Sequence, residues 1–326
     1  MNTMLYQLEL DQTDIPTGMS YVFQLDDGRF VIIDGGYFTT GEEDRLYAFL
    51  AGRSDGKPVI ALWFLTHAHQ DHVGAFMLFV EKYSKVVELQ RLMYNFHPAD
   101  LSKAQGDWRV MGNNLATLKE LYRRMAAYCT GVETITPKAG DTFCIGELQI
   151  EVIFTWEGLY PDKGTINHGA TSVANDHSTV VRTSVGGTVI LWLADAGTKA
   201  TAVLLENPDN LACDLVQVAH HGLNNYDGLT RLYDATKARI VLWPACDYGM
   251  VGRSKCPVAR YILQKMGAAE HHVSGYGTVC LPLPYQPGTA TKYPKAQGLK
   301  MAVAAGLDGL GTNSPPYRYL TPMGIV

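Results

Sequence analysis

The fold is decided by residues 59–74, whose sequence reads VIALWFLTHAHQDHVG. The first part, Val59–Leu65, is a continuous apolar run with the length and the β-branched and aromatic character of a buried strand. Apolar residues return at helical spacing after Asp71, which is a candidate N-cap of that helix. The sequence therefore predicts a buried strand, a polar cluster at its C-terminal end, and then a helix.

The residues before this stretch predict paired strands. Met4–Leu10 and Ser20–Leu25 have strand-like patterns, and a turn then leads into the apolar run Phe30–Ile33. That run ends in Asp34-Gly35-Gly36, so a hairpin carries an aspartate to the end of a strand. Glu42–Ala51 has helical spacing and precedes the buried strand.

Residues 97–135 break the alternation of strands and helices that follows. A strand is predicted at Leu89–Asn95, and after it comes a loop that contains Trp108. The helix predicted at Asn114–Tyr128 has its apolar residues on one face. We interpret residues 97–135 as an insertion.

Strand patterns dominate the second half of the chain. We predict strands at Phe143–Phe154, Ser178–Ser184, Thr188–Ala194, Leu215–Ala219, Ile240–Trp243 and Thr278–Pro282, and helices near Lys199–Leu205, Leu229–Ala235 and Val258–Met266. Together these elements predict an α/β (α+β) fold, with one domain over residues 1–285. Residues 286–326 are rich in Pro, Gly and Tyr and predict an irregular C-terminal arm.

Four potential metal ligands lie within six residues behind the buried strand. His67 and His69 are two apart, so in an extended segment both imidazoles point to the same side and can bind one metal ion. Asp71 and His72 follow at the turn into the helix and point differently, so they can serve a second ion. The alternatives are a site for a single metal ion and a polar loop whose histidines are solvated.

This HxHxDH motif at residues 67–72 resembles the signature loop of the metallo-β-lactamase superfamily. Ile33–Gly36 is similar to the first motif of that family, Leu193–Gly197 to its bridging-aspartate motif, and residues 220–222, His-His-Gly, complete the set. The arrangement, with the pattern at Asn175–Val180, most resembles ComEC-like and phosphorylcholine-esterase-like members. The resemblance implies an αββα sandwich of the metallo-β-lactamase type, with the site at one edge.

The resemblance also implies that Asp195 binds both metal ions. The residues support this independently, because an aspartate at the end of an apolar run is hard to bury unless a cation accompanies it. The alternative is that Asp195 is the N-cap of the helix near Lys199–Leu205. Asp34 is expected to hold the signature loop through hydrogen bonds without binding metal.

Three further histidines are candidates around this site. His220 and His221 end a predicted strand and would point to opposite faces, so we assign His220 as a metal ligand. His221 is then the catalytic group that donates a hydrogen bond or a proton to the substrate. His177 is the candidate for the remaining ligand, or for a group that faces the substrate, and His168 is expected to be solvated.

The chain departs from the ComEC-like pattern near residue 256. Such relatives usually have a His-Pro pair at the start of a helix, whereas this chain has Cys256-Pro257. A histidine expected to face the substrate or to donate a proton is therefore missing. Because of this difference, the resemblance does not identify the substrate.

These features predict a metal-dependent hydrolase that uses a metal-bound hydroxide at a dinuclear site, acting on a phosphodiester or a related ester. Asp71 is both a ligand and the catalytic acceptor that orients the attacking water. Zinc is the first candidate for the two divalent ions, with manganese and iron as alternatives. The alternative functions are a lactone or thioester hydrolase, a diiron oxidoreductase, and a metal-binding protein that does no catalysis. Sites of the diiron kind usually have a glutamate where this chain has His69.

Composition limits the partners and the location. The formal charge is −5, so the chain has no overall basic field to attract nucleic acid, and a small-molecule or phosphodiester substrate is favoured. The six cysteines are scattered without a CxxC pair, which favours reduced thiols, and the longest apolar runs are too short to span a membrane. A cytoplasmic location is expected, and the sequence does not indicate an oligomeric state.

Overall fold

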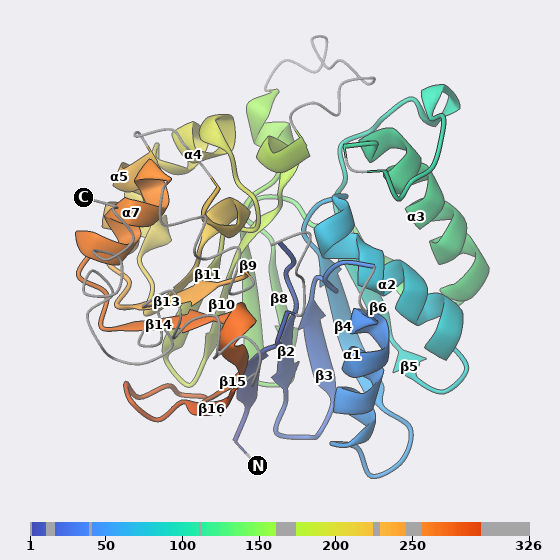
Figure 1. The fold of residues 1–326 in the computed structure, drawn as a ribbon, viewed down its shortest axis with the longest axis horizontal. Coiled ribbons are helices and arrows are strands. Elements are labelled where there is room, and N and C mark those ends of the chain that lie inside the picture. The colour runs from blue at the N-terminus through green and yellow to red at the C-terminus, as the bar shows by residue number, and fades with distance from the viewer. Residues whose placement is uncertain are drawn as a thin grey trace.

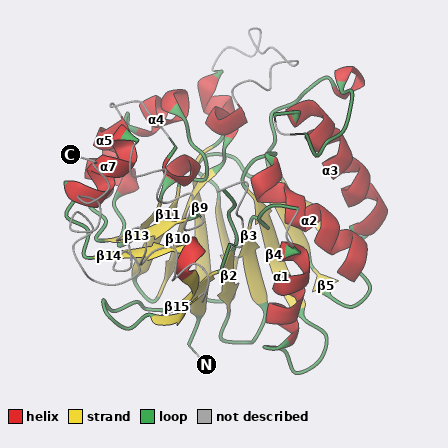
Figure 2. Cartoon of the chain, in the orientation of Figure 1, coloured by secondary structure: helices red, strands yellow, loops and turns green. Residues whose placement is uncertain are grey.

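The computed structural model describes residues 2–10, 17–38, 41–110, 112–160, 174–223, 229–245 and 256–294. In this part of the chain two β-sheets face each other, and helices cover the outer side of each sheet (Figure 1). Figure 2 shows the resulting layers, with strands in the middle and helices on both sides. The α/β class and the αββα sandwich expected from the sequence are confirmed.

The first sheet contains the N-terminal hairpin and the strand of the quoted stretch. Its order is β16-β15-β1-β2-β3-β4-β6-β7, and β5 also pairs with β4. The neighbours β3 and β4 are parallel, as are β4 and β6. The bounds are β1 Met4–Gln7, β2 Tyr21–Gln24, β3 Phe30–Ile33, β4 Val59–Leu65, β5 Glu88–Leu89, β6 Arg91–Tyr94, β7 Glu133–Ile135, β15 Gly277–Pro282 and β16 Thr291–Pro294.

The second sheet has the order β14-β13-β12-β11-β10-β9-β8. The strands β8 to β11 are antiparallel neighbours, whereas β11 to β14 are parallel neighbours. The bounds are β8 Thr142–Ile145, β9 Leu148–Phe154, β10 Val180–Val185, β11 Thr188–Trp192, β12 Leu215–Gln217, β13 Ile240–Trp243 and β14 Glu270–Val273.

Three helices cover each sheet in the described part of the chain. Side chains of α1, α2 and α3 share a buried cluster with the outer face of the first sheet, and those of α4, α5 and α7 share one with the second sheet. Local sequence favours these helices: Asn113 caps α3 by accepting a hydrogen bond from the Ala116 amide at 3.4 Å. The bounds are α1 Glu42–Ala51, α2 Gln70–Tyr83, α3 Asn114–Tyr128, α4 Thr198–Leu204, α5 Thr230–Thr236 and α7 Pro257–Gln264.

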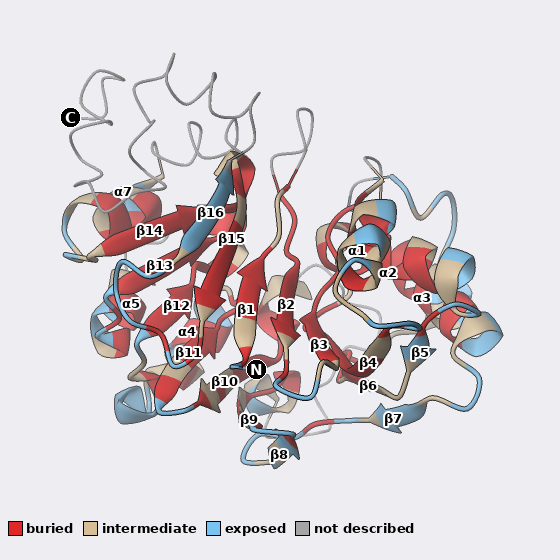
Figure 3. Cartoon of the chain, turned by 90° about the horizontal axis from the view of Figure 1, so that it is seen from below, coloured by how far each residue is buried: buried red, intermediate tan, exposed pale blue. Residues whose placement is uncertain are grey.

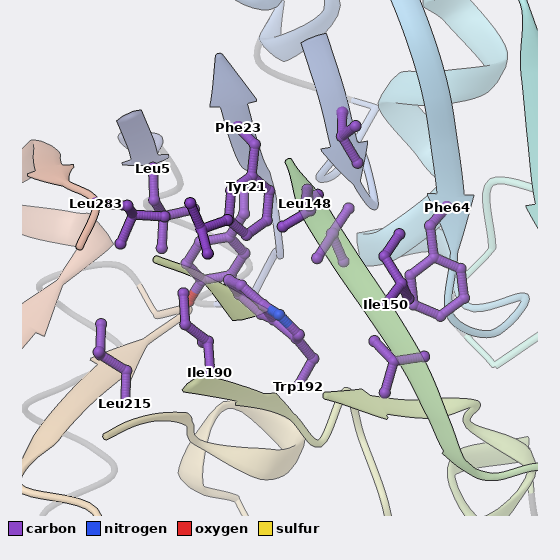
Figure 4. Packing of buried hydrophobic residues seen from close by; sticks show 14 of the residues in the cluster. Leu5, Tyr21, Phe23, Phe64, Leu148, Ile150, Ile190, Trp192, Leu215 and Leu283 are labelled. Carbon is purple, nitrogen blue, oxygen red and sulfur yellow. The ribbon is translucent and has the colours of Figure 1, made fainter. Parts of the chain in front are cut away.

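A third cluster fills the space between the two sheets (Figure 4). Tyr21 and Phe23 from β2 meet Trp192 from β11, and the Tyr21 and Trp192 rings pack edge to face with centroids 4.7 Å apart. Each fully buried side chain of this size contributes about 1.5–3 kcal/mol relative to an exposed one. The two sheets are therefore held in a fixed relation, which matters because the candidate ligands come from both.

The structure differs from the sequence prediction around residues 97–135. After α3 the chain forms β7, a strand that the sequence pattern does not predict, which pairs in parallel with β6 and extends the first sheet. At the other end of that sheet, β16 lies within the predicted irregular arm and pairs with β15. Figure 3 shows that β7 and β16 are largely exposed, which explains why neither has a clear apolar pattern.

The strand β14 was also not predicted from the sequence, because its residues Glu270-His271-His272-Val273 look polar although all four are buried. Specific partners compensate: the Tyr285 hydroxyl donates to Glu270 Oε2 at 2.5 Å, and Trp243 Nε1 donates to His271 Nδ1 at 3.0 Å. Within the described residues, no helix is long and apolar enough to cross a lipid bilayer.

The strand ends place the polar motifs along one edge of the sandwich. Asp34 follows β3 and the histidine motif follows β4, while Asp195 and His221 come soon after β11 and β12 of the other sheet. A backbone hydrogen bond from the Thr179 amide to the Thr66 carbonyl, 3.0 Å, joins the two sheets at this edge. Neighbouring parallel strands end on the same side, so their C-terminal loops converge there.

Candidate metal centre

Six potential ligands gather into two groups at this edge. His67, His69 and Asp195 form the first group, and each offers one ligand atom within 4.8 Å of the others. Asp71, His72 and His221 form the second group by the same measure. Five of these residues are predicted metal ligands, and His221 is the sixth.

The helix α2 explains how one short motif serves both groups. His69 is its N-cap residue with extended backbone, so Asp71 lies in the first turn and is not the predicted N-cap. The change from extended backbone to helix directs the ligand atoms of Asp71 and His72 to the second group, although the His67 and His72 rings stay in contact with centroids 4.2 Å apart. Neighbours in sequence thereby face different groups.

Asp195 lies between the two groups and directs one oxygen to each. Its Oδ2 lies 3.6 Å from His67 Nε2, while its Oδ1 lies 3.1 Å from His72 Nε2 and 3.4 Å from His221 Nε2. The side chain is almost completely buried. This is the arrangement that a carboxylate shared by two cations requires.

The alternative role for Asp195, as the cap of α4, does not fit the structure. Gly197 occupies the N-cap position of α4. The amides of Lys199 and Ala200 donate instead to Asp176 Oδ1, at 2.9 and 3.0 Å. Asp176, and not Asp195, therefore accepts the hydrogen bonds of the free amides at the start of α4.

Hydrogen bonds on the outer side of the rings fix their orientation. His72 Nδ1 donates to Asp34 Oδ2 at 2.6 Å, and His221 Nδ1 donates to the Pro244 carbonyl at 2.6 Å. The third ring, His67, has Nδ1 3.1 Å from Thr66 Oγ1, whose own hydrogen is directed at Asp34. In the neutral form of each ring the proton therefore lies on Nδ1, and Nε2 presents to the centre the lone pair with which histidine binds metal.

The centre of the site fits divalent cations. His72 Nε2 and His221 Nε2 lie 3.3 Å apart, so their lone pairs face each other. Among the described residues, His67 Nε2 and Asp195 Oδ1 are buried without a hydrogen-bond partner. Buried acceptors that face one another repel unless a positive charge lies between them. Imidazole and carboxylate donors of this kind suit zinc, manganese or iron.

Asp34 organises the end of β4 as the sequence analysis expects. Its Oδ1 accepts from the Thr66 amide at 2.8 Å, and its Oδ2 accepts from the Thr66 hydroxyl at 2.8 Å in addition to His72. The carboxylate is fully buried behind the ligands. It belongs to neither group and acts on them through Thr66 and His72.

Backbone strain is concentrated around the same edge. In the described part of the chain five residues other than glycine have positive φ, and four of them are Asp34 (55°), Ala194 (48°), His220 (49°) and His221 (54°). Such conformations cost on the order of 1–3 kcal/mol each and cluster at functional sites. Here they turn the chain sharply just after β3, β11 and β12, which places the ligands.

The pKa shifts at the site favour charged carboxylates and a neutral His69. Burial would raise the pKa of Asp71, but His221 and His72 outweigh it and hold this pKa well below the usual range. Burial and the neighbouring His67 lower the pKa of His69 to about 3. Burial also opposes a charge on His72, yet Asp195 and Asp34 raise its pKa well above normal. The carboxylates of Asp195 and Asp34 therefore favour positive charge at the position of His72 between them.

The positions of His220 and His221 differ from those expected for an extended strand. The sequence predicts an extended strand through Ala219, but β12 ends at Gln217 and both histidines have left-handed backbone, so alternation no longer applies. As a result His221 joins the second group. His220 lies outside both groups, with Nε2 3.1 Å from Asn175 Nδ2.

His177 lies beside the first group but is not part of it. Its ring stacks on His97 with centroids 4.2 Å apart and planes 10° from parallel, and the Tyr160 hydroxyl lies 3.1 Å from its Nε2. The sequence analysis did not identify His97. The sequence feature that points to His97 is its position soon after β6, because β6 pairs in parallel with β4 and a polar residue there lies near the end of β4. His168 is outside the described residues.

Gln217 positions the turn that carries Asp195. This fully buried side chain accepts from the Ala194 amide at 2.6 Å and donates to the Ala194 carbonyl at 3.1 Å. The side-chain amide of Gln217 thus pairs both the N–H and the carbonyl of Ala194, which has positive φ and precedes Asp195. Because Gln217 also ends β12, the side chain links the turns that carry Asp195 and His221.

Replacing Gln217 with methionine, which keeps the length but removes these hydrogen bonds, is expected to weaken metal affinity by about 10–100-fold. Thr183→Val is the matched control, since it removes a buried hydrogen bond from Trp192 Nε1, 2.9 Å long, on the neighbouring strands. Titration of metal into both folded variants checks this. Equal affinity in the two variants would mean that Gln217 serves stability alone.

Comparison with known proteins agrees with the motif. The model of the metallo-beta-lactamase superfamily matches residues 15–104, which include the HxHxDH motif, and so supports a place in that superfamily. No curated protein matches the sequence.

Several solved structures are similar at low identity. The metallo-beta-lactamase fold protein YhfI from Bacillus subtilis is 15% identical over 74% of this chain and 85% of that one, with a TM-score of 0.42. Zinc-bound PqqB from Methylobacterium extorquens is 13% identical over 71% and 76%, with a TM-score of 0.41. The diiron β-hydroxylase CmlA from Streptomyces venezuelae is 10% identical over 74% of this chain and 44% of that one, with a TM-score of 0.42. These likenesses are too distant to assign an activity or a metal.

Proposed function

We propose that this protein is a metal-dependent hydrolase of the metallo-β-lactamase superfamily that acts at a dinuclear site on a phosphodiester or a related ester. The observation that carries the proposal is the position of Asp195, which directs one carboxylate oxygen to each of two ligand groups. A site for a single metal ion would need no such shared carboxylate. The more specific ComEC-like or phosphorylcholine-esterase-like kinship is part of this proposal and rests on the sequence motifs alone.

His67, His69 and Asp195 would hold one cation, and Asp71, His72, His221 and Asp195 the other. Two bound divalent cations would lower the pKa of a water molecule and stabilise the charge on the attacking and leaving oxygens of an ester. Zinc is the first candidate because its protein sites are built from imidazole and carboxylate ligands, and manganese or iron are the alternatives.

Two groups of the chain itself would act on the water and the substrate. Asp71 remains ionised because its pKa is held low, so it can accept a hydrogen bond from the attacking water and orient it. His220 takes the substrate-facing role that the sequence analysis gives to His221. Its Nε2 lies 3.1 Å from the Asn175 amide nitrogen.

The other functions differ from this one in a measurable way. A lactone or thioester hydrolase would use the same residues on another carbonyl or acyl group. A diiron oxidoreductase would consume dioxygen or nitric oxide, and the imidazole of His69 in the first group favours hydrolysis over that chemistry. A protein that only binds metal would show no turnover with any of these substrates.

The test compares hydrolysis of bis-(p-nitrophenyl) phosphate with that of a lactone and a thioester, before and after removal of metal with a chelator. We expect the diester to be the best substrate, and its hydrolysis to stop on chelation and return with added zinc or manganese. Preference for the lactone or the thioester would establish the alternative hydrolase. Activity that survives complete removal of metal would contradict the proposal.

A further inference from the structure

A cavity of about 30 Å³ lies directly beside the first ligand group and shares His67 with it. Three parts of the chain enclose it: the residues after β6, the start of α3 and the turn before β10. Its other lining residues are Ala68, Phe96, His97, Asn114, Leu118, Ala174 and His177. This volume accommodates about two groups the size of a water molecule, so whatever enters the cavity is compact.

The stacked imidazoles of His97 and His177 form one wall of this cavity. Both rings are buried, and the Trp156 ring packs edge to face against His97 with ring centroids 4.8 Å apart, which supports the pair. The Trp156 indole nitrogen donates to Asn95 Oδ1 at 2.8 Å, so the ring that supports the pair is itself held in place. The wall is therefore preformed.

The cavity is uncharged. Among the described residues that line it there is no lysine, arginine, aspartate or glutamate. An anionic group placed here would meet no basic side chain among these residues, whereas a small neutral group would lose little hydration.

We propose that this cavity is a substrate subsite that takes a compact, uncharged substituent of the ester, such as a methyl, ethyl or hydroxyethyl group. The inference rests on the proposed function, because it concerns the part of the substrate next to the bond that is broken at the adjacent ligand groups. It favours diesters with one small substituent over those, such as a nucleic acid strand, that place bulky and charged units on both sides of each phosphate. Residues 97–135 thereby acquire a role, since Asn114 and Leu118 of α3 close the subsite.

The experiment uses p-nitrophenyl phosphate diesters whose second substituent is methyl, ethyl, phenyl or a nucleoside. For the metal-loaded wild-type protein we expect kcat/KM to be highest with methyl and ethyl and lowest with the nucleoside. Leu118→Ala enlarges the cavity and should raise the kcat/KM of the phenyl diester relative to the methyl diester by about tenfold or more. Ala174→Val narrows the cavity and should lower the ethyl diester relative to the methyl diester.

Leu121→Ala is the matched control, because Leu121 lies one turn further along α3, is fully buried and is not among the lining residues. It should reduce stability to a similar extent and leave the substrate ratios at their wild-type values. Ratios that stay unchanged in Leu118→Ala and Ala174→Val, or a wild-type preference for the nucleoside diester, would overturn the subsite. If no diester is hydrolysed at all, the proposed function fails and the subsite falls with it, which is a different result from turnover with unchanged ratios.

Discussion

Asp195→Asn is expected to lose both high-affinity metal binding and catalysis while the protein stays folded. The change keeps the shape of the side chain but removes the negative charge that faces His67 on one side and His72 and His221 on the other. Loss of a residue that only hydrogen-bonds to a ligand costs about 10–100-fold in affinity or activity, so loss of a shared ligand should cost more. Metal content and kcat/KM on the same sample measure both effects.

Asp176→Asn provides the control for Asp195→Asn. Asp176 is a buried aspartate from the same edge of the sandwich, but it caps α4 and contacts neither group. Its replacement should lower stability by about 1 kcal/mol and leave the metal content unchanged. If Asp195→Asn keeps full metal content and normal turnover, Asp195 is not a shared ligand.

Asp71→Ala is expected to abolish hydrolysis and to leave the fold intact. The second group loses its only carboxylate besides that of Asp195, whereas His67, His69 and Asp195 of the first group remain. Metal content should therefore fall towards one ion per chain. Because Asp71 lies in the first turn of α2 and not at its N-cap, stability should fall by no more than about 1 kcal/mol.

Melting temperature, metal content and phosphodiesterase rate on one preparation of Asp71→Ala decide this prediction. A stable protein with normal turnover and full metal occupancy would overturn the role of Asp71. A large loss of stability would instead mean that Asp71 is mainly structural.

The parts of the fold that the sequence predicts best are those governed by local rules. The bounds of α1, β4 and α3 agree with the prediction, because the two helices have helical spacing and β4 is a continuous apolar run with distinct ends. The strand β14 was missed since the partners that compensate its buried polar side chains, Trp243 and Tyr285, come from other parts of the chain. A sequence pattern shows polarity but not the hydrogen bond that satisfies it.

The candidate site shows the same contrast between what local sequence determines and what depends on distant parts of the chain. His67, His69, Asp71 and His72 could be identified because one strand and one helix place them, and Asp195 because it follows an apolar strand. His221 lies in the second group and His220 does not, because the left-handed backbone at both residues removes the alternation of an extended strand. His97 could not be recognised alone, since its partner His177 is far away in sequence.

The most direct test of the central claim is an anomalous difference map, recorded at the absorption edge of the bound metal, from crystals of protein purified without added metal. We predict two peaks, one at the atoms of His67, His69 and Asp195 and the other at those of Asp71, His72 and His221, with Asp195 in contact with both. A single peak, or a map in which Asp195 contacts only one ion, would contradict the dinuclear site.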